Sequence, residues 1–513
     1  MSTVSIGPAR WRVILIVLVI AEITSAFEVG MMYAALATVM REFRDPAGTG
    51  WLITAFLLVG SVSAALCSRL GDLYGRKRLV LLMLACATSG SLLAAFAPNL
   101  PLLIAGRAVQ GFSVALLPLC IGLVREHLPA PRVPVAIGWL AAMASFSAGS
   151  GIVLGGWVVD EFGWRSIFWF SASHAAVALV CVAAVLPAST RQAASKQLDV
   201  LGGVLLAPAV AALLWAVTRL KGSGLHDPVT VVLTVVGLLA LVLWVRREWH
   251  HPQPMIDVRR LGERQLGLTM LLMALFGLGT SQLMLVVLLV GQQPAWTGIG
   301  LGLSATLAST LKIPSSVAGL VGAPWSGHVA AKHGARRAAL IGALLVCVGW
   351  CALTLWHDAV WLLVALSLVI TFGGAMLYAA MPNLVVEVAP PERTSEINGM
   401  SHVVRTLGTA IGTQLATVLL ASSTVSDLAR GSATHPSPAA FEATFFFITA
   451  CAAACIAVAW ALPRCPSPSP FPFALSLSKC RREEPVRAEV SKPTFGLGKP
   501  FDTSGRTEGG GLR

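Results

Sequence analysis

Charged side chains are scarce in this sequence. Asp, Glu, Lys and Arg make up only 12% of its 513 residues, whereas 56% are hydrophobic and the mean hydropathy is +0.77. Soluble domains usually contain about 25% charged residues, because their surfaces face water. The composition therefore excludes a soluble globular protein and indicates an all-α polytopic protein that spans a lipid bilayer.

The sequence also lacks the patterns of a metal site or a hydrolytic enzyme. Its ten cysteines include no C-x-x-C pair, its ten histidines are scattered, and neither H-E-x-x-H nor G-x-S-x-G occurs. We therefore expect no enzyme activity, no metal and no cofactor. A membrane sensor is disfavoured as well, because no stretch outside the apolar segments resembles a folded soluble domain.

Positive charge is present, but it sits in short loops between apolar runs. The formal net charge is +13 and the isoelectric point is about 9.7. Cationic loops are typical of the cytoplasmic side of membrane proteins, so we favour a topological role over a nucleic-acid partner.

Apolar windows of about 20 residues predict fourteen membrane-spanning helices. The predicted spans are Trp11–Ala37, Trp51–Leu70, Leu79–Ala97, Pro101–Val124, Val133–Val159, Trp164–Leu186, Leu201–Thr218, Pro228–Val245, Leu266–Gly291, Thr306–Ala330, Arg337–Trp356, Ala359–Met381, Gly399–Ser422 and Phe441–Leu462.

One polar stretch, SRLGDLYGRKR from Ser68 to Arg78, fixes the expected orientation. It lies between the second and third spans and contains three consecutive cations. The positive-inside rule places this loop in the cytoplasm, and an even number of spans then places both termini there. We expect a multi-pass protein of the inner (plasma) membrane.

The spans divide into two blocks of six with two extra helices between them. We expect a cytoplasmic N-terminus at residues 1–10, bundles at 11–190 and 266–463, a linker with the two extra helices at 191–265, and a disordered cytoplasmic tail at 464–513. The stretch SGHVAAKHGARR, from Ser326 to Arg337, follows the second helix of the second block and is similar to Ser68–Arg78. Two matched halves are typical of transporters whose site lies between them.

Ionisable residues inside the spans are the strongest functional signal, because each costs several kcal/mol in hydrocarbon unless it is paired or faces water. Glu22 lies near the middle of the first span, and Glu28 lies about 9 Å further along it at 1.5 Å per residue. Arg107 enters the fourth span at a depth similar to that of Glu28. A Glu28–Arg107 ion pair that forms and breaks with protonation is one hypothesis, and a Glu28 that faces water in an outer vestibule is the other.

Glu22 has the better claim to face a central cavity, where it could carry a proton or meet a cationic substrate. The alternative for Glu22 is a structural hydrogen bond to a neighbouring helix. His174 and Gln282 are further cavity candidates, although single polar residues in spans usually bond between helices. Arg405 precedes Gly408 and Gly412, whose G-x-x-x-G spacing favours close helix packing.

At this point the motifs resemble a known family. LGDLYGRKR is similar to the loop motif G-x-L-x-D-x-x-G-R-K/R of the major facilitator superfamily, with Ser68 in place of the first glycine. The fourth span resembles the R-x-x-Q-G motif of that superfamily at Arg107, Gln110 and Gly111. The resemblance covers about residues 10–463 and is specific in its combination of motifs.

The central helix pair, the LDVLGG stretch and HPQPMIDVRRL resemble the fourteen-helix drug:proton antiporter branch, and PNLVVEVAPPERTSEINGM resembles its actinobacterial members. The fifth span is similar to the antiporter motif G-x-x-x-G-P-x-x-G-G. Ser147 and Ile152 replace its first glycine and its proline, whereas Gly151, Gly155 and Gly156 remain and would pack the helix tightly.

The resemblance implies two six-helix bundles that rock around a midplane site, with no enzyme activity. Asp72 would accept hydrogen bonds from a helix N-terminus of the other bundle, Gly75 would permit the tight turn, and Arg76 would pair with nearby acids, which together form a conformational latch. Glu22, Glu28 and Arg107 would couple transport to protons.

The implied function is proton-coupled efflux of small lipophilic drugs or toxic compounds by a monomer. Glu22 and Gln110, with Gln282 and His174, would bind the substrate. The alternative is a transporter of the same fold that carries one endogenous metabolite or lipid, with or without proton coupling. The altered antiporter motif favours this alternative.

Overall fold

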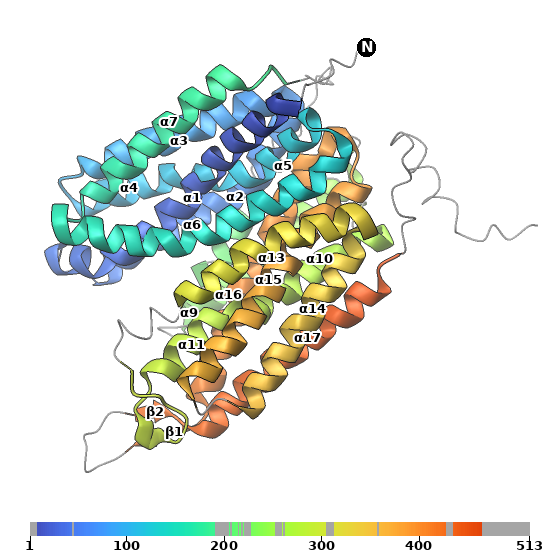
Figure 1. Cartoon of the computed structure of the whole chain (residues 1–513). Helices are drawn as coiled ribbons and strands as arrows, with labels where there is room; N and C mark the ends of the chain where they lie inside the picture. Colours follow the sequence, from blue (N-terminus) through green and yellow to red (C-terminus); the bar gives the residue numbers. More distant parts are fainter. Residues whose placement is uncertain are drawn as a thin grey trace, which may run out of the picture.

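The computed structural model describes residues 8–43, 46–189, 227–251, 262–303, 312–356, 359–426 and 434–463, together with residue 259 and parts of 205–219. Almost all of these residues are helical, and two helical bundles account for most of the molecule (Figure 1).

The first bundle, blue to teal in Figure 1, contains the N-terminal helices. Its elements are α1 (Pro8–Phe43), α2 (Pro46–Tyr74), α3 (Arg76–Ala95), α4 (Leu100–Gln110), the 3₁₀ segment η1 (Gly111–Ala115), α5 (Leu116–His127), η2 (Ala130–Arg132), α6 (Val133–Phe162) and α7 (Ser166–Val185).

The second bundle, yellow-green to orange-red, follows the helix α9 (Pro228–His250). Its elements are α10 (Arg264–Leu278), η4 (Thr280–Gln282), α11 (Leu283–Gln292), η5 (Ala295–Thr297), α13 (Lys312–His333), α14 (Ala335–Leu355), α15 (Val360–Val388), η6 (Pro391–Arg393), α16 (Thr394–Ala421) and α17 (Pro438–Ala461). A short antiparallel pair, β1 (Thr424–Ser426) and β2 (Thr434–Pro436), connects α16 to α17.

Twelve described helices are long and apolar enough to cross a membrane. α13 is not among the twelve, and half of the predicted span 201–218 lies outside the described residues, as do the predicted tail and most of the N-terminus at 1–10. A helical membrane protein is therefore confirmed, and the count of fourteen spans stays a prediction.

Local chemistry explains several helix starts. The Asn99 side chain accepts a hydrogen bond from the Leu102 backbone N–H at 3.0 Å, and Ser437 accepts one from Ala440 at 3.2 Å. Such N-caps satisfy backbone N–H groups that lack a partner in the first helical turn. The helices α4 and α17 thus begin where a polar residue precedes the apolar run.

The fourth predicted span is not one continuous helix, because η1 interrupts it between α4 and α5. A Cβ added at Gly111 would lie 2.7 Å from the Phe56 carbonyl oxygen of α2, so the 3₁₀ segment lies very close to that helix. The interruption places Ser113 in the interior, next to α1.

The helix α9 covers part of the seam between the bundles. Trp244 of α9 belongs to one buried apolar cluster with Ala65 of α2 and Val403 of α16. An inserted helix therefore contacts both bundles at the same place.

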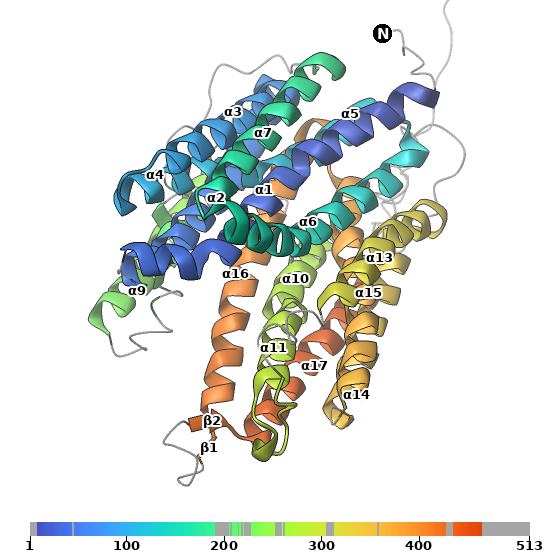
Figure 2. The same ribbon diagram turned by 60° about the vertical axis from the view of Figure 1, so that its left-hand side comes forward.

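The bundles approach each other most closely along two helix pairs, α6 with α13 and α2 with α16. A Cβ at Gly327 would clash with the backbone of Pro134, and one at Gly399 would clash with Ala64 and Ser68. We call the end that carries the loop between α2 and α3 the Asp72 end. Figure 2 shows α16 running from the short β1–β2 pair to the first bundle.

Candidate functional site

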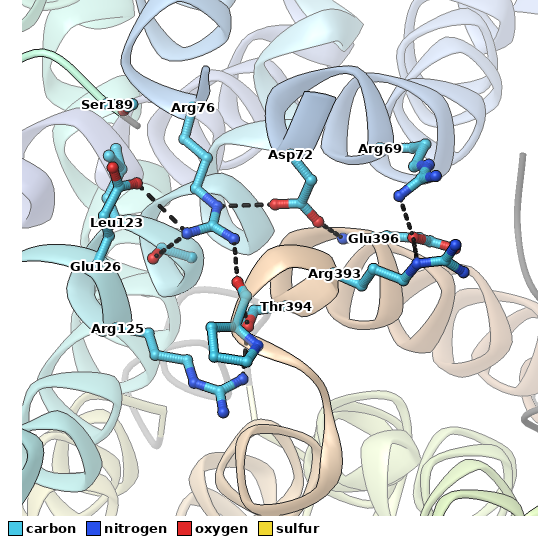
Figure 3. A network of polar contacts seen from close by, with 12 residues as sticks. Arg69, Asp72, Arg76, Leu123, Arg125, Glu126, Ser189, Arg393, Thr394 and Glu396 are labelled. Atoms are coloured by element: carbon cyan, nitrogen blue, oxygen red, sulfur yellow. Dashed lines mark hydrogen bonds and ion pairs between the residues drawn. The ribbon is translucent and has the colours of Figure 1, made fainter. Parts of the chain in front are cut away.

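Asp72 lies in the last turn of α2 and connects the two bundles (Figure 3). Its side chain is buried, and Oδ2 accepts a hydrogen bond from the backbone N–H of Glu396 at 2.8 Å. Glu396 lies in the first turn of α16, where N–H groups lack helical partners and the helix dipole favours a carboxylate. Asp72 therefore makes the type of contact that its motif predicts, and its role as a latch stays a prediction.

Arg76, the first residue of α3, extends this contact in three directions. Its Nε donates to Oδ1 of Asp72 at 2.7 Å, and the same guanidinium donates to the carbonyl oxygens of Gly122 at 3.0 Å and Pro391 at 2.6 Å. The Glu126 carboxylate lies 3.4 Å away. One arginine thus joins α2, α5 and the start of the second bundle's α16 region.

Two further arginines, to which the sequence assigned no role, also cross between the bundles. Arg69 forms a nearly buried ion pair with Glu396 at 2.8 Å. Arg125 donates to the Ala389 carbonyl at 2.6 Å and to the Thr394 hydroxyl at 2.7 Å. We call these contacts, with those of Asp72 and Arg76, the interbundle network.

The loop glycines support the internal repeat. Gly75 has a φ of 104° directly before α3, and Gly334 has a φ of 85° directly before α14. These left-handed conformations favour glycine, because a Cβ would strain the backbone. In the second half the Glu387 carboxylate accepts a hydrogen bond from the Ala335 N–H at 2.9 Å. An acid therefore also binds the N-terminus of the helix that follows this loop.

A second polar cluster lies inside the first bundle. Arg107 donates to the backbone carbonyls of Leu52 at 3.1 Å and Glu28 at 3.2 Å, and to the Gln110 side chain at 2.8 Å. The Glu28 carboxylate accepts from the Ser113 hydroxyl at 2.6 Å. The five residues of this cluster come from α1, α2, α4 and η1.

The predicted Glu28–Arg107 ion pair is therefore absent from this conformation. The Arg107 guanidinium donates to neutral acceptors, and the Glu28 carboxylate accepts from the Ser113 hydroxyl of η1. The vestibule alternative is also wrong here, because Glu28 is only 2% exposed. Gln110 is equally engaged, since its amide nitrogen donates to Ser91 at 2.6 Å; the predicted substrate contact of Gln110 would require this pair to open.

Glu22 is buried in α1, and its Oε2 has no hydrogen-bond partner among the described residues. It lies close enough to Tyr378 of α15 for an electrostatic interaction. Glu22 thus lies within electrostatic range of the second bundle. Its role in binding a proton or a substrate stays a prediction.

A small cavity lies between the bundles next to the interbundle network, since its lining on α16 begins at Asn398, two residues after Glu396. Residues from α5, α6, α10, α15 and α16 line it. They are Leu117, Pro118, Ile121, Ile137, Ala141, Met273, Tyr378, Met381, Pro382, Asn398, Ser401, His402 and Arg405. The wall formed by the first bundle is apolar, and the polar side chains come from α15 and α16.

Two predicted cavity residues lie elsewhere. Gln282 in η4 donates to the carbonyl of Thr409 at 3.2 Å and accepts from Thr413 at 2.9 Å, so its amide joins the α10 segment to α16. The His174 ring contacts the Ile20 carbonyl at 3.1 Å and Phe27 edge-on, at the contact between α7 and α1. Both make the interhelical contacts that single polar residues in spans usually make.

The motif glycines differ in their surroundings. A Cβ at Gly151 would lie 3.3 Å from Cα of Gly30, and one at Gly155 would lie 2.7 Å from Cα of Met31, so both permit close packing of α6 on α1. Gly156 has nothing within 4 Å of such a Cβ in the described structure, which corrects its predicted packing role.

The second predicted packing motif lies on α16. A Cβ at Gly408 would lie 2.6 Å from the Ala274 carbonyl oxygen, and one at Gly412 would overlap the Leu278 carbonyl. Both glycines therefore bring α16 against α10, as their spacing predicts.

Comparison with known proteins agrees with this architecture. Residues 18–311 and 268–487 match the family described as the Major Facilitator Superfamily. The chain belongs to this superfamily. It is a multi-pass membrane transporter of the major facilitator fold and not an enzyme.

Relatives of this superfamily member differ in what their names say they transport. The Multidrug resistance protein B homolog of Mycobacterium tuberculosis is 27% identical over 418 residues, which cover 79% of this chain and 75% of the relative. The Uridine/deoxyuridine transporter of Lactococcus lactis is 27% identical over 412 residues, covering 78% and 85%.

A solved structure has the same fold. The MFS proton:xylose symporter XylE bound to 6-bromo-6-deoxy-D-glucose matches with a TM-score of 0.62 at 13% identity, and the match covers 90% of this chain and 98% of that one. At this identity the likeness concerns the fold.

Proposed function

We propose that this superfamily member exports lipophilic compounds in exchange for protons, through fourteen spans and with both termini in the cytoplasm. The observation that carries this proposal is a cavity between the bundles, beside which the interbundle network connects the bundles at the Asp72 end. With the Asp72 end in the cytoplasm, the conformation is closed toward the cytoplasm. Breaking the network would let the bundles rock and expose the cavity on that side.

The proton step is assigned to Glu22 and Glu28. Both carboxyl groups are 2% exposed, and one oxygen of each has no hydrogen-bond donor among the described residues. A buried carboxyl group that has an oxygen without a donor and forms no ion pair is suited to carry a proton between two sides. An ion pair between the Arg107 guanidinium and the Glu28 carboxylate would form only in another conformation. In this one the guanidinium donates to the Leu52 carbonyl and the Gln110 side chain.

The M. tuberculosis relative named as a multidrug resistance protein supports efflux as the direction of transport. The apolar wall from α5 and α6 supports lipophilic substrates, since such a surface is buried favourably against an apolar ligand.

Proteoliposomes with an imposed pH gradient and a panel of lipophilic dyes test this function. We expect dye movement that collapses with the gradient, and Glu22→Gln should reduce it to the level of empty liposomes while the protein still folds. Glu161→Gln is the matched control, because Glu161 is exposed at the end of α6. Gradient-driven transport by Glu22→Gln at the wild-type rate would remove Glu22 from the coupling step.

A second candidate is a transporter for one endogenous metabolite or lipid without proton coupling. Ser147 and Ile152 in the antiporter motif favour it, as does the polar wall of the cavity. The relative named as a uridine transporter shows that a chain this similar can have a single substrate class. Saturable transport of one metabolite that ignores the pH gradient, with no dye movement, would favour this second function.

A further inference from the structure

Arg405 is a cation in the cavity that forms no ion pair with any acid among the described residues. It lies on α16, and its guanidinium carbon stacks 5.1 Å from the centre of the Tyr378 ring. Within the part of the chain that the structure describes, this guanidinium makes no hydrogen bond and no ion pair. A cation in the interior of a membrane protein is costly, so such residues usually have a partner or meet a ligand.

The geometry of the side chain favours a planar acidic partner. A guanidinium offers five N–H donors in a fixed fork that matches carboxylate geometry, and all of its donors remain available here. The Tyr378 ring orients the plane of Arg405 through a cation–π contact without using those donors. Arg107 differs, because protein carbonyls and the Gln110 amide already occupy it.

The rest of the cavity suits the apolar body of such a ligand. Leu117, Ile121 and Ile137 approach from the first bundle, and Met273 and Met381 approach from the second. Methionine side chains adapt to differently shaped apolar groups. Arg405 is the charged group among a few polar side chains on α15 and α16, and a few polar groups on an otherwise apolar surface are the usual composition of a small-molecule site.

We propose that the cavity binds lipophilic organic anions, with the acidic group of the ligand on Arg405 and its apolar body against the wall of α5 and α6. This inference rests on the proposed export function and adds the charge class of the substrate. Arg405 is then the residue that selects among lipophilic compounds, and Tyr378 positions it.

Binding to the purified full-length protein in detergent tests the inference separately from transport. Fluorescein is the anionic probe and rhodamine 6G the cationic probe, each followed by fluorescence polarisation. We expect Arg405→Gln to weaken fluorescein binding by about tenfold or more and to leave or improve rhodamine 6G binding, because a charged hydrogen-bonded pair is lost only for the anion. Arg405→Lys should recover only part of the affinity, since an ammonium lacks the fork.

Arg132→Gln is the matched control. Arg132 also stacks on an aromatic ring, 5.5 Å from the centre of Trp11, but lies exposed outside the cavity. The Arg132→Gln protein should bind both probes with the wild-type affinity. Tyr378→Phe should retain fluorescein binding, and Tyr378→Leu should weaken it.

Three outcomes separate this inference from the export function. A wild-type protein that binds rhodamine 6G but not fluorescein overturns the anion site and leaves export intact. Equal loss of both probes in Arg405→Gln also overturns it, because the arginine would then only shape the cavity. Fluorescein that binds through Arg405 but is not moved by proteoliposomes under a pH gradient supports the anion site and contradicts the export function.

Discussion

The Asp72 carboxylate accepts a hydrogen bond from the backbone N–H of Glu396, 2.8 Å away and 324 residues later in the sequence. The same Glu396 also holds Arg69 through its side chain at 2.8 Å. The N-terminus of α16 therefore binds the Asp72 carboxylate of α2 through a backbone N–H group. Its own Glu396 carboxylate binds the Arg69 guanidinium of α2. Both contacts connect α2 to the other bundle, so we expect closure at the Asp72 end to depend on them.

We expect Asp72→Asn to loosen this closure. Asparagine can still accept from the Glu396 N–H, but it loses the charge at the helix N-terminus and the ion pair with Arg76. A charge at this position stabilises by about 0.3–2 kcal/mol, so the open fraction should rise by about 2- to 30-fold. Labelling of a Ser401→Cys reporter in the cavity by an impermeant maleimide, added at the Asp72 side, measures this fraction.

Asp160→Asn is the control for Asp72→Asn, because Asp160 is exposed at the far end of α6. Labelling at position 401 that is the same in the wild type, Asp72→Asn and Asp160→Asn would show that Asp72 does not hold the closed state.

The Arg69–Glu396 pair should be coupled in energy. Arg69→Met leaves the buried Glu396 carboxylate with Arg393, 4.0 Å away, as its ion-pair partner. Removing one member of a buried pair costs about 3–5 kcal/mol at most. The double variant Arg69→Met/Glu396→Met should recover part of this loss, as measured by thermal unfolding in detergent. Arg165→Gln breaks an exposed pair with Glu42 and should cost about 1 kcal/mol or less. A double variant as unstable as the sum of its single variants would contradict the coupling.

Much of the fold follows from the sequence, because span length and hydropathy fix membrane helices strongly. The repeat of Ser68–Arg78 at Ser326–Arg337 was visible too, and both loops indeed turn at a glycine with positive φ. The 3₁₀ break at Gly111 could not be predicted, since it depends on how closely α2 approaches.

The site was less accessible to prediction. The loop motif predicts a role for Asp72 and Arg76. No sequence signal predicts one for Arg69 and Arg125, because their contacts depend on how the second bundle packs against the first. Glu396 carried a signal, because an acid in the first turn of an apolar helix favours its N-terminus. Nothing in uniformly apolar helices says which face lines a cavity, so the sequence predicts no role for Tyr378 and His402, and Arg405 stands out only as the cation before the packing glycines Gly408 and Gly412.

Adjacent glycines of α6 should respond in opposite ways to alanine. Gly155→Ala places a Cβ 2.7 Å from Cα of Met31, and overpacking of this kind costs about 1–3 kcal/mol. Gly156→Ala meets nothing within 4 Å and should match or exceed wild-type stability, because alanine favours helix by about 0.5–1 kcal/mol. Thermal unfolding midpoints in detergent compare the two, and equal midpoints would mean that α6 does not pack on α1 through Gly155.

Arg107 should prove essential to the structure of the first bundle, whatever part it has in proton coupling. Its guanidinium joins α1, α2 and α4 through Glu28, Leu52 and Gln110, and it stacks 4.4 Å from the Phe56 ring. A lysine ammonium cannot span these acceptors, so Arg107→Lys should lower the free energy of unfolding by about 2 kcal/mol or more, at about 1 kcal/mol for each lost hydrogen bond. The exposed Arg132→Lys should change it by less than about 0.5 kcal/mol, as surface substitutions usually do. An Arg107→Lys protein that melts like the wild type but no longer transports would assign Arg107 to coupling instead of bundle architecture.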